Sequence, residues 1–217
     1  MPHDVDMTTH YYAGFWRRFG AFWVDFLVFL PLIVLNGRLY DYCHSKSLAV
    51  TSFVLYSALY HVYVIYCHGR WGRTIGKLTT GIRISSLTFE PITWRQAIVR
   101  SSIDVCFTII SCVGTALAFA AMSDEAMSTN GLDRSKLLLS LHPTWDRYAN
   151  WGQQAWIWGE FVVMMTNSKR RALHDFIAGT VVVQERGVEK KKWDKDDPLL
   201  RDFSKDLKQF NKLKNPF

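Results

Sequence analysis

Hydrophobic residues gather in four long blocks that are separated by charged segments. The blocks cover residues 15–36, 48–67, 97–122 and 151–167. At a rise of about 1.5 Å per residue, helices of these lengths approach or exceed the roughly 30 Å hydrocarbon core of a bilayer. The pattern therefore predicts an all-α membrane protein, built as a bundle of four transmembrane helices with short interfacial helices beside it.

The segments around these blocks divide the chain further. We expect an N-terminal tail at residues 1–10, a membrane domain at 11–185 and a charged tail at 186–217. Apolar residues at helical spacing predict an amphipathic helix over about 198–213, with a solvated tail as the alternative. Within the membrane domain, the long outer loop 123–150 includes "SKLLLSLHPTW", which predicts a short helix ending at Pro143.

Cations outnumber acids, and they flank the apolar blocks. The net charge is +7, from 26 lysines and arginines against 19 acids. A basic balance fits nucleic acid or an anionic membrane surface, and this placement favours the membrane and no nucleic acid. The segment 68–96 carries five cations against one acid, so the positive-inside rule puts it and both termini in the cytoplasm. We expect an integral, multi-pass protein of a bacterial inner membrane.

Several basic residues next to the blocks are candidates for contact with lipid headgroups. They are Arg17, Arg73, Lys77, Arg170 and Arg171. The stretch "GRWGRTIGKLTTGIRI", residues 69–84, is not a phosphate-binding loop, because Trp71 and Leu78 stand where that loop needs Gly and Ser or Thr. We expect an interfacial turn there instead, followed by a short strand or hairpin in "IRISSLTFEPITW".

Ionisable residues also fall inside the blocks. Asp25, Asp104 and Glu160 lie in three different predicted spans, and His61 lies in a fourth. A lone charge at the centre of a bilayer costs at least ~2.5 kcal/mol, so such groups face protein or water. They form either a proton or ion pathway or structural pairs that fix helix packing. Arg100 precedes Asp104 by four residues and can pair with it, whereas Glu160 has no cation one turn away.

The stretch "RRALHDFIAGTVVV", residues 170–183, joins the last block to the charged tail. His174 and Asp175 are adjacent, so on a helix they point about 100° apart and cannot form a catalytic dyad with each other. No nucleophile motif accompanies them and no metal-ligand spacing is present, so we expect neither an enzyme nor a metal or cofactor site. Asp175 is expected to hold an arginine, with Arg18 the best candidate, while His174 supports the local turn. Gly179 would end the helix, and "TVVV" would continue as a strand.

Four of these stretches, in this order, resemble the RDD family of multi-pass membrane proteins. They are "YAGFWRRFGAFWVDF", "GRTIGKLTTGIRI", "PITWRQAIVRS" and "LHDFIAGTVVV". The resemblance implies an integral helical membrane domain. It also implies ion or proton exchange, a role suggested for some members, or an accessory role in membrane complexes, suggested for others.

The function expected from these observations is that of an accessory or assembly subunit of a membrane complex. The alternative is a cation/proton antiporter that exchanges Na⁺, Li⁺ or K⁺ for H⁺ as an oligomer. In that alternative Asp25, Asp104, Glu160 and His61 line the path. A structural charge network would comprise Arg18, Arg100, His174 and Asp175. The expected partners are membrane lipids and either further copies of this chain or other subunits.

Overall fold

The computed structural model describes residues 12–42, 45–129 and 131–185. The predicted tail at 1–10 and the predicted amphipathic helix at 198–213 lie outside the described residues. Within them the chain is mostly helical, as expected. Four long helices dominate: α1 (Phe15–Tyr42), α2 (Lys46–Trp71), α4 (Trp94–Ala121) and α7 (Thr144–Thr166).

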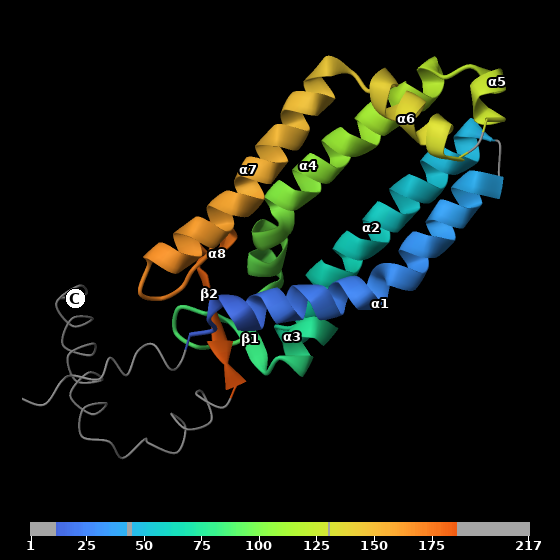
Figure 1. Ribbon diagram of the computed structural model, residues 1–217. Coiled ribbons are helices and arrows are strands. Elements are labelled where there is room, and N and C mark those ends of the chain that lie inside the picture. The colour runs from blue at the N-terminus through green and yellow to red at the C-terminus, as the bar shows by residue number, and fades with distance from the viewer. Residues whose placement is uncertain (1–11, 43–44, 130, 186–217) are drawn as a thin grey trace, which may run out of the picture.

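The long helices pack in the order α1, α2, α4, α7. Figure 1 shows α2, α4 and α7 side by side, with α1 starting across one end of the bundle and then running next to α2. Large apolar side chains on their outer faces are exposed, among them Leu27, Leu55 and Val162. Exposed apolar surface of this extent suits contact with lipid rather than water.

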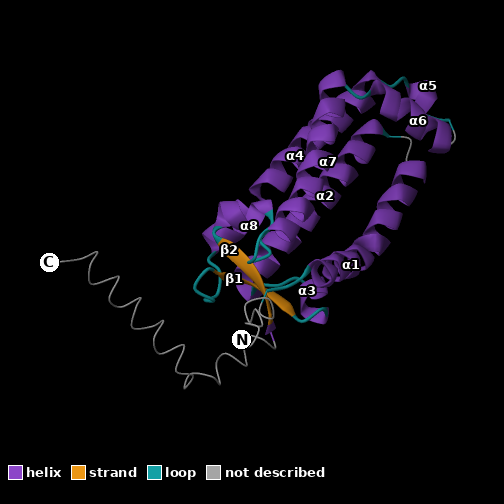
Figure 2. Cartoon of the chain, turned by 60° about the vertical axis from the view of Figure 1, so that its left-hand side comes forward, coloured by secondary structure: helices purple, strands orange, loops and turns teal. Residues whose placement is uncertain are grey.

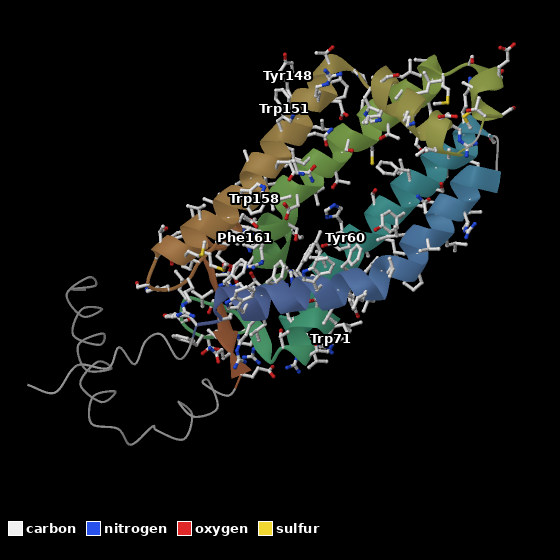
Figure 3. The ribbon with its side chains drawn as sticks, viewed as in Figure 1. Tyr60, Trp71, Tyr148, Trp151, Trp158 and Phe161 are labelled. Atoms are coloured by element: carbon white, nitrogen blue, oxygen red, sulfur yellow. The ribbon has the colours of Figure 1, made fainter. Side chains whose placement is uncertain are left out.

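Three of the four predicted spans are long and apolar enough to cross a membrane. They lie within Phe15–Leu39, Lys46–Trp71 and Trp94–Ala121. The fourth, α7, is 23 residues long but carries Gln153, Gln154 and Glu160, which lower its hydropathy. Figure 3 shows exposed aromatic side chains near both ends of the bundle, with Trp71 at one end and Tyr148 and Trp151 on α7 towards the other.

One end of the bundle, here called the far end, is closed by two short helices. These are α5 (Asp124–Met127) and α6 (Gly131–Leu141). Helix α6 ends just before Pro143, as predicted for this part of the loop 123–150. Buried apolar residues from α2, α4 and α5 pack together beneath the short helices: Ala49, Phe119, Met122 and Met127.

The opposite end, here called the sheet end, carries two short helices and two strands. They are α3 (Ile75–Thr79), β1 (Ile82–Ser86), α8 (Leu173–Ala178) and β2 (Thr180–Gln184). The strands pair antiparallel, with Ile84 opposite Val182, and Figure 2 shows them against the end of the bundle away from α5 and α6. The all-α expectation is thus corrected by one small sheet, formed where β-branched residues cluster.

Glycine at the end of α8 lets the chain turn into β2. Gly179 has a left-handed φ of 64°, which costs a residue without a Cβ little. The same strand is extended on its other side, because the Ala13 N–H donates to the Val182 carbonyl at 2.9 Å. A cluster of buried apolar residues joins both strands to the starts of α1 and α4: Ala13, Ala21, Ile82, Ile84, Ile92, Ala97 and Val182. The sheet therefore fixes the place where the charged residues meet.

Candidate functional site: a buried charge network at the sheet end

Asp175 lies at the centre of a cluster of charged side chains. Its carboxylate is completely buried. One oxygen accepts from Arg18 Nη1 at 2.8 Å and from the Ala172 N–H at 3.0 Å. The other oxygen accepts from Arg100 Nη1 and from the Thr180 hydroxyl at 3.1 Å. Burial alone would raise the pKa of Asp175, but Arg100 and Arg18 hold that pKa well below its ordinary value.

Arg100 reaches this cluster from the first half of α4. Besides Asp175, its guanidinium donates to the Thr180 hydroxyl at 2.9 Å and to His174 Nε2 at 2.5 Å. The predicted pair between Arg100 and Asp104 is therefore wrong. Asp104 instead accepts from the Trp156 indole N–H at 3.2 Å. The fully buried Asp175 carboxylate attracts the Arg100 guanidinium more strongly, because water does not screen the two charges there.

His174 bridges two helices rather than merely supporting its own turn. A guanidinium only donates hydrogen bonds, so His174 Nε2 must accept from Arg100. The ring's proton then sits on Nδ1, which contacts the Glu160 carboxylate on α7. A continuous chain of contacts results, from Glu160 through His174 and Arg100 to Asp175 and Arg18. We name these five residues the charge network.

Arg18 ties the start of α1 to the chain that follows α7. Its Nη2 donates to the Arg170 carbonyl at 2.6 Å, and its Nε donates to the Ala13 carbonyl at 3.3 Å. The structure thus places Arg18 on Asp175, the partner expected from the sequence. The network joins α1 and α4 to α7 and α8, which follow them much later in the chain.

Asp25 occupies a separate site between α1, α2 and α3. Its carboxylate accepts from the Tyr63 hydroxyl at 2.8 Å, the Thr74 hydroxyl at 2.6 Å and the Gly76 N–H at 2.8 Å. A Cβ added at Gly76 would overlap the Ala21 carbonyl oxygen, so only glycine lets α3 lie this close to α1. Asp25 therefore fastens α3 to the first long helix.

Within the described residues, the groups proposed for a proton or ion path have different hydrogen-bond partners, although the charge of Glu160 acts on Asp104. His61 lies 2.7 Å from the Thr108 hydroxyl, through its Nε2. Asp25 is held by α2 and α3, Asp104 by Trp156 and Glu160 by His174. Each acid inside the bundle thus has its own hydrogen-bond donor.

Only some of the residues predicted to meet lipid headgroups face outward. Lys77 Nζ lies 3.1 Å from Nε2 of the buried His68, and burial followed by repulsion from Arg100 lowers the pKa of Lys77 to about 8. Arg73 pairs with Glu185. Arg171 donates to the carbonyls of Thr180 and Asp175 and lies 4.0 Å above the Phe176 ring. Protein groups thus lie close to all three cations, and their contact with lipid headgroups stays a prediction.

Sequence reasoning missed two donors within the bundle. Tyr63 and Trp156 hold Asp25 and Asp104, yet they come from other helices, and no spacing in the chain points to them. Thr74 and Gly76 lie within the quoted stretch "GRTIGKLTTGIRI", so that motif contained two of the three donors to Asp25. Thr180 was likewise part of "LHDFIAGTVVV".

Fold and site together define a multi-pass helical membrane protein whose helices are tied at one end by a buried charge network and a small sheet. The chain belongs to the RDD family, whose model matches residues 12–179. It is also similar to the uncharacterized membrane protein YteJ of Bacillus subtilis (strain 168), with 24% identity over 192 residues, covering 85% of this chain and 88% of that protein. No solved structure matches the chain.

Proposed function

We propose that this protein is a non-enzymatic accessory or assembly subunit of a membrane complex. The observation that carries the proposal is that the acids inside the bundle are held by donors of the fold itself. Asp25 accepts three hydrogen bonds, and Glu160 is engaged by His174. Carboxylates bound in this way hold helices together and are not free to bind a passing cation. A rigid membrane domain is what a subunit that positions others requires.

The sheet supports four crossings with both ends of the domain on one side. Strand β1 follows α2, and its partner β2 follows α7. If α4 crossed the membrane and α7 did not, these strands would lie on opposite sides and could not pair. At about 1.5 Å per residue, the 23 residues of α7 reach about 35 Å, enough for a span. The five cations in 68–96 favour a cytoplasmic sheet end, in a bacterial inner membrane.

The alternative is a cation/proton antiporter that acts as an oligomer. The observation in its favour is the charge network, which runs from Glu160 on α7 to Arg18 on α1. Within it, the contact between Glu160 and His174 joins two titratable groups of the kind that form proton relays. Exchange of Na⁺, Li⁺ or K⁺ would then pass Glu160 and Asp104, with a wet path completed by a second copy.

Purification of the full chain with its neighbours tests the accessory role. The tagged protein, expressed at its natural level, is cross-linked in intact membranes, extracted in mild detergent and analysed by mass spectrometry. We expect a second membrane protein in a fixed ratio to this chain. The Asp124→Asn variant, which is altered at an exposed carboxylate near the far end, serves as the control and is purified in the same way. Recovery of this chain alone, as a homo-oligomer, would contradict the proposal.

A transport measurement separates the two candidates. The purified protein is placed in vesicles with a preset pH gradient, and Na⁺, Li⁺ or K⁺ is added. An accessory subunit leaves the gradient unchanged by any of the three. Dissipation that disappears in Glu160→Gln would overturn the accessory role and establish the antiporter.

A further inference from the structure

An open groove lies between the start of α1 and the end of α7. Its volume is about 420 Å³, and its lining residues are Phe15, Met164, Met165, Asn167, Ser168 and Arg170. One wall is apolar. The Phe15 ring packs edge-on against the Phe161 ring, with 5.4 Å between the ring centroids, and Met165 is 66% exposed. Trp16, next to Phe15 and 78% exposed, lies beside this wall. An exposed tryptophan and an apolar wall at a helix end are typical of the boundary between hydrocarbon and headgroups.

The other wall carries the guanidinium of Arg170 and the hydroxyl of Ser168. Within the described residues, the Arg170 guanidinium makes no hydrogen bond or ion pair, and neither does the Ser168 hydroxyl. The Arg170 backbone, in contrast, is held firmly, because its carbonyl accepts from Arg18 at 2.6 Å. Its φ is 48°, a left-handed value that a residue with a side chain adopts only when its surroundings impose it.

Glycine at the start of the domain leaves room for this arginine. A Cβ added at Gly14 would lie 2.6 Å from Arg170 Nη1. The guanidinium thus lies over bare backbone at the edge of the groove, next to the apolar wall. The charge network fixes the chain beneath it and leaves its donors unused.

We propose that this groove binds an anionic phospholipid. The acyl chain would lie along Phe15 and Met165, and the headgroup phosphate would accept from Arg170 and Ser168. A guanidinium offers the forked donors that suit a phosphate. The exposed side chain of Lys169, between Ser168 and Arg170 in the chain, adds positive charge nearby, which favours an anionic over a zwitterionic headgroup. The inference does not depend on whether the protein is an accessory subunit or an antiporter.

Lipid retention by the purified full chain tests this site. Native mass spectrometry in detergent measures the apparent affinity for added phosphatidylglycerol and for phosphatidylcholine. We expect wild type to prefer phosphatidylglycerol, and Arg170→Gly to bind it about fivefold more weakly, the effect of one cation near an anionic surface. Glycine accepts the left-handed φ of this position, so Arg170→Gly should melt no lower than wild type.

Two further variants sharpen the result. Gly14→Ala should displace the guanidinium and weaken phosphatidylglycerol binding while leaving the number of cations unchanged. Lys169→Gln removes a neighbouring exposed cation and should have a clearly smaller effect than Arg170→Gly. Equal losses in Arg170→Gly and Lys169→Gln would reduce the effect to general charge attraction and overturn the proposal. Equal retention of phosphatidylglycerol and phosphatidylcholine by wild type would also overturn the proposal. So would a cross-link between residue 165 and another protein in the membrane, because the groove would then be a protein interface.

Discussion

Asp175 is a fully buried carboxylate that faces two arginines from different helices. Moving such a group out of water costs several kcal/mol, and the attraction to Arg18 and Arg100 offsets that cost. The excess of positive charge explains why the carboxylate stays ionised far below its ordinary pKa. Both arginines contact this one carboxylate directly.

Replacing Asp175 by Asn should therefore be severe. The side chain keeps its shape, but two buried guanidiniums lose their negative partner, and we expect a loss of about 3–5 kcal/mol in unfolding free energy. The readouts are the yield of monodisperse protein and its melting temperature in detergent. Asp124→Asn is the matched control, since it removes an exposed carboxylate paired with Lys46 at 2.7 Å and should change neither. Similar behaviour of the two variants would refute a structural role for the charge network.

Lys77 gives a second residue-scale prediction, on pH. Burial lowers its pKa to about 8, against about 10.4 in an unfolded chain. Between these two values the unfolded chain binds more protons, so the contribution of Lys77 to stability rises with pH. The melting temperature of wild type relative to Lys77→Met should increase from about pH 8 to about pH 10. Parallel curves over that range would show that the amine is not held in a buried site.

Among the elements, α3 keeps its position because its backbone packs directly against α1. Gly76 lies against the Ala21 carbonyl and donates to Asp25, and a Cβ there would be 2.8 Å from the Asp25 carboxyl carbon. Gly76→Ala should push α3 away from α1 and cost about 1–3 kcal/mol, as overpacking does. Gly37→Ala, in α1 with nothing within 4 Å, should instead stabilise the helix by up to about 1 kcal/mol. Melting temperatures that move the same way in both variants would contradict the packing argument.

Local patterns predicted elements better than they predicted partners. The apolar blocks, the β-branched run before residue 184 and the glycine at 179 act over a few residues, and the helices and β2 formed where they indicate. The pairing rule within one helix selected Asp104 for Arg100, because it compares only neighbours on the same turn. Asp175 is 75 positions away from Arg100, yet it pairs with Arg100 because its buried carboxylate is surrounded by donors. Lys77 turned inward for a similar reason, since Gly76 draws α3 against the bundle.

At the scale of the whole molecule, the sheet constrains how the chain passes through the membrane. The far end holds α5 and α6, while α3, α8 and both strands lie at the sheet end (Figure 1). Residues 88 and 169 are exposed near the sheet end, and residue 135 is exposed on α6. The only long helices between residues 88 and 169 are α4 and α7. Whether α7 crosses therefore decides whether these two positions share a side.

Single cysteines at these three positions can settle the number of crossings. The four native cysteines are first replaced by alanine or serine, and Thr88→Cys, Lys169→Cys and Ser135→Cys are made separately. A maleimide that cannot cross membranes is then applied to intact cells and to inverted vesicles. If α7 spans the bilayer, Cys at 88 and at 169 react only in inverted vesicles, and Cys at 135 reacts only in intact cells. Labelling of 88 and 169 from opposite sides would mean that α7 does not cross, and β1 and β2 could then not pair within one chain.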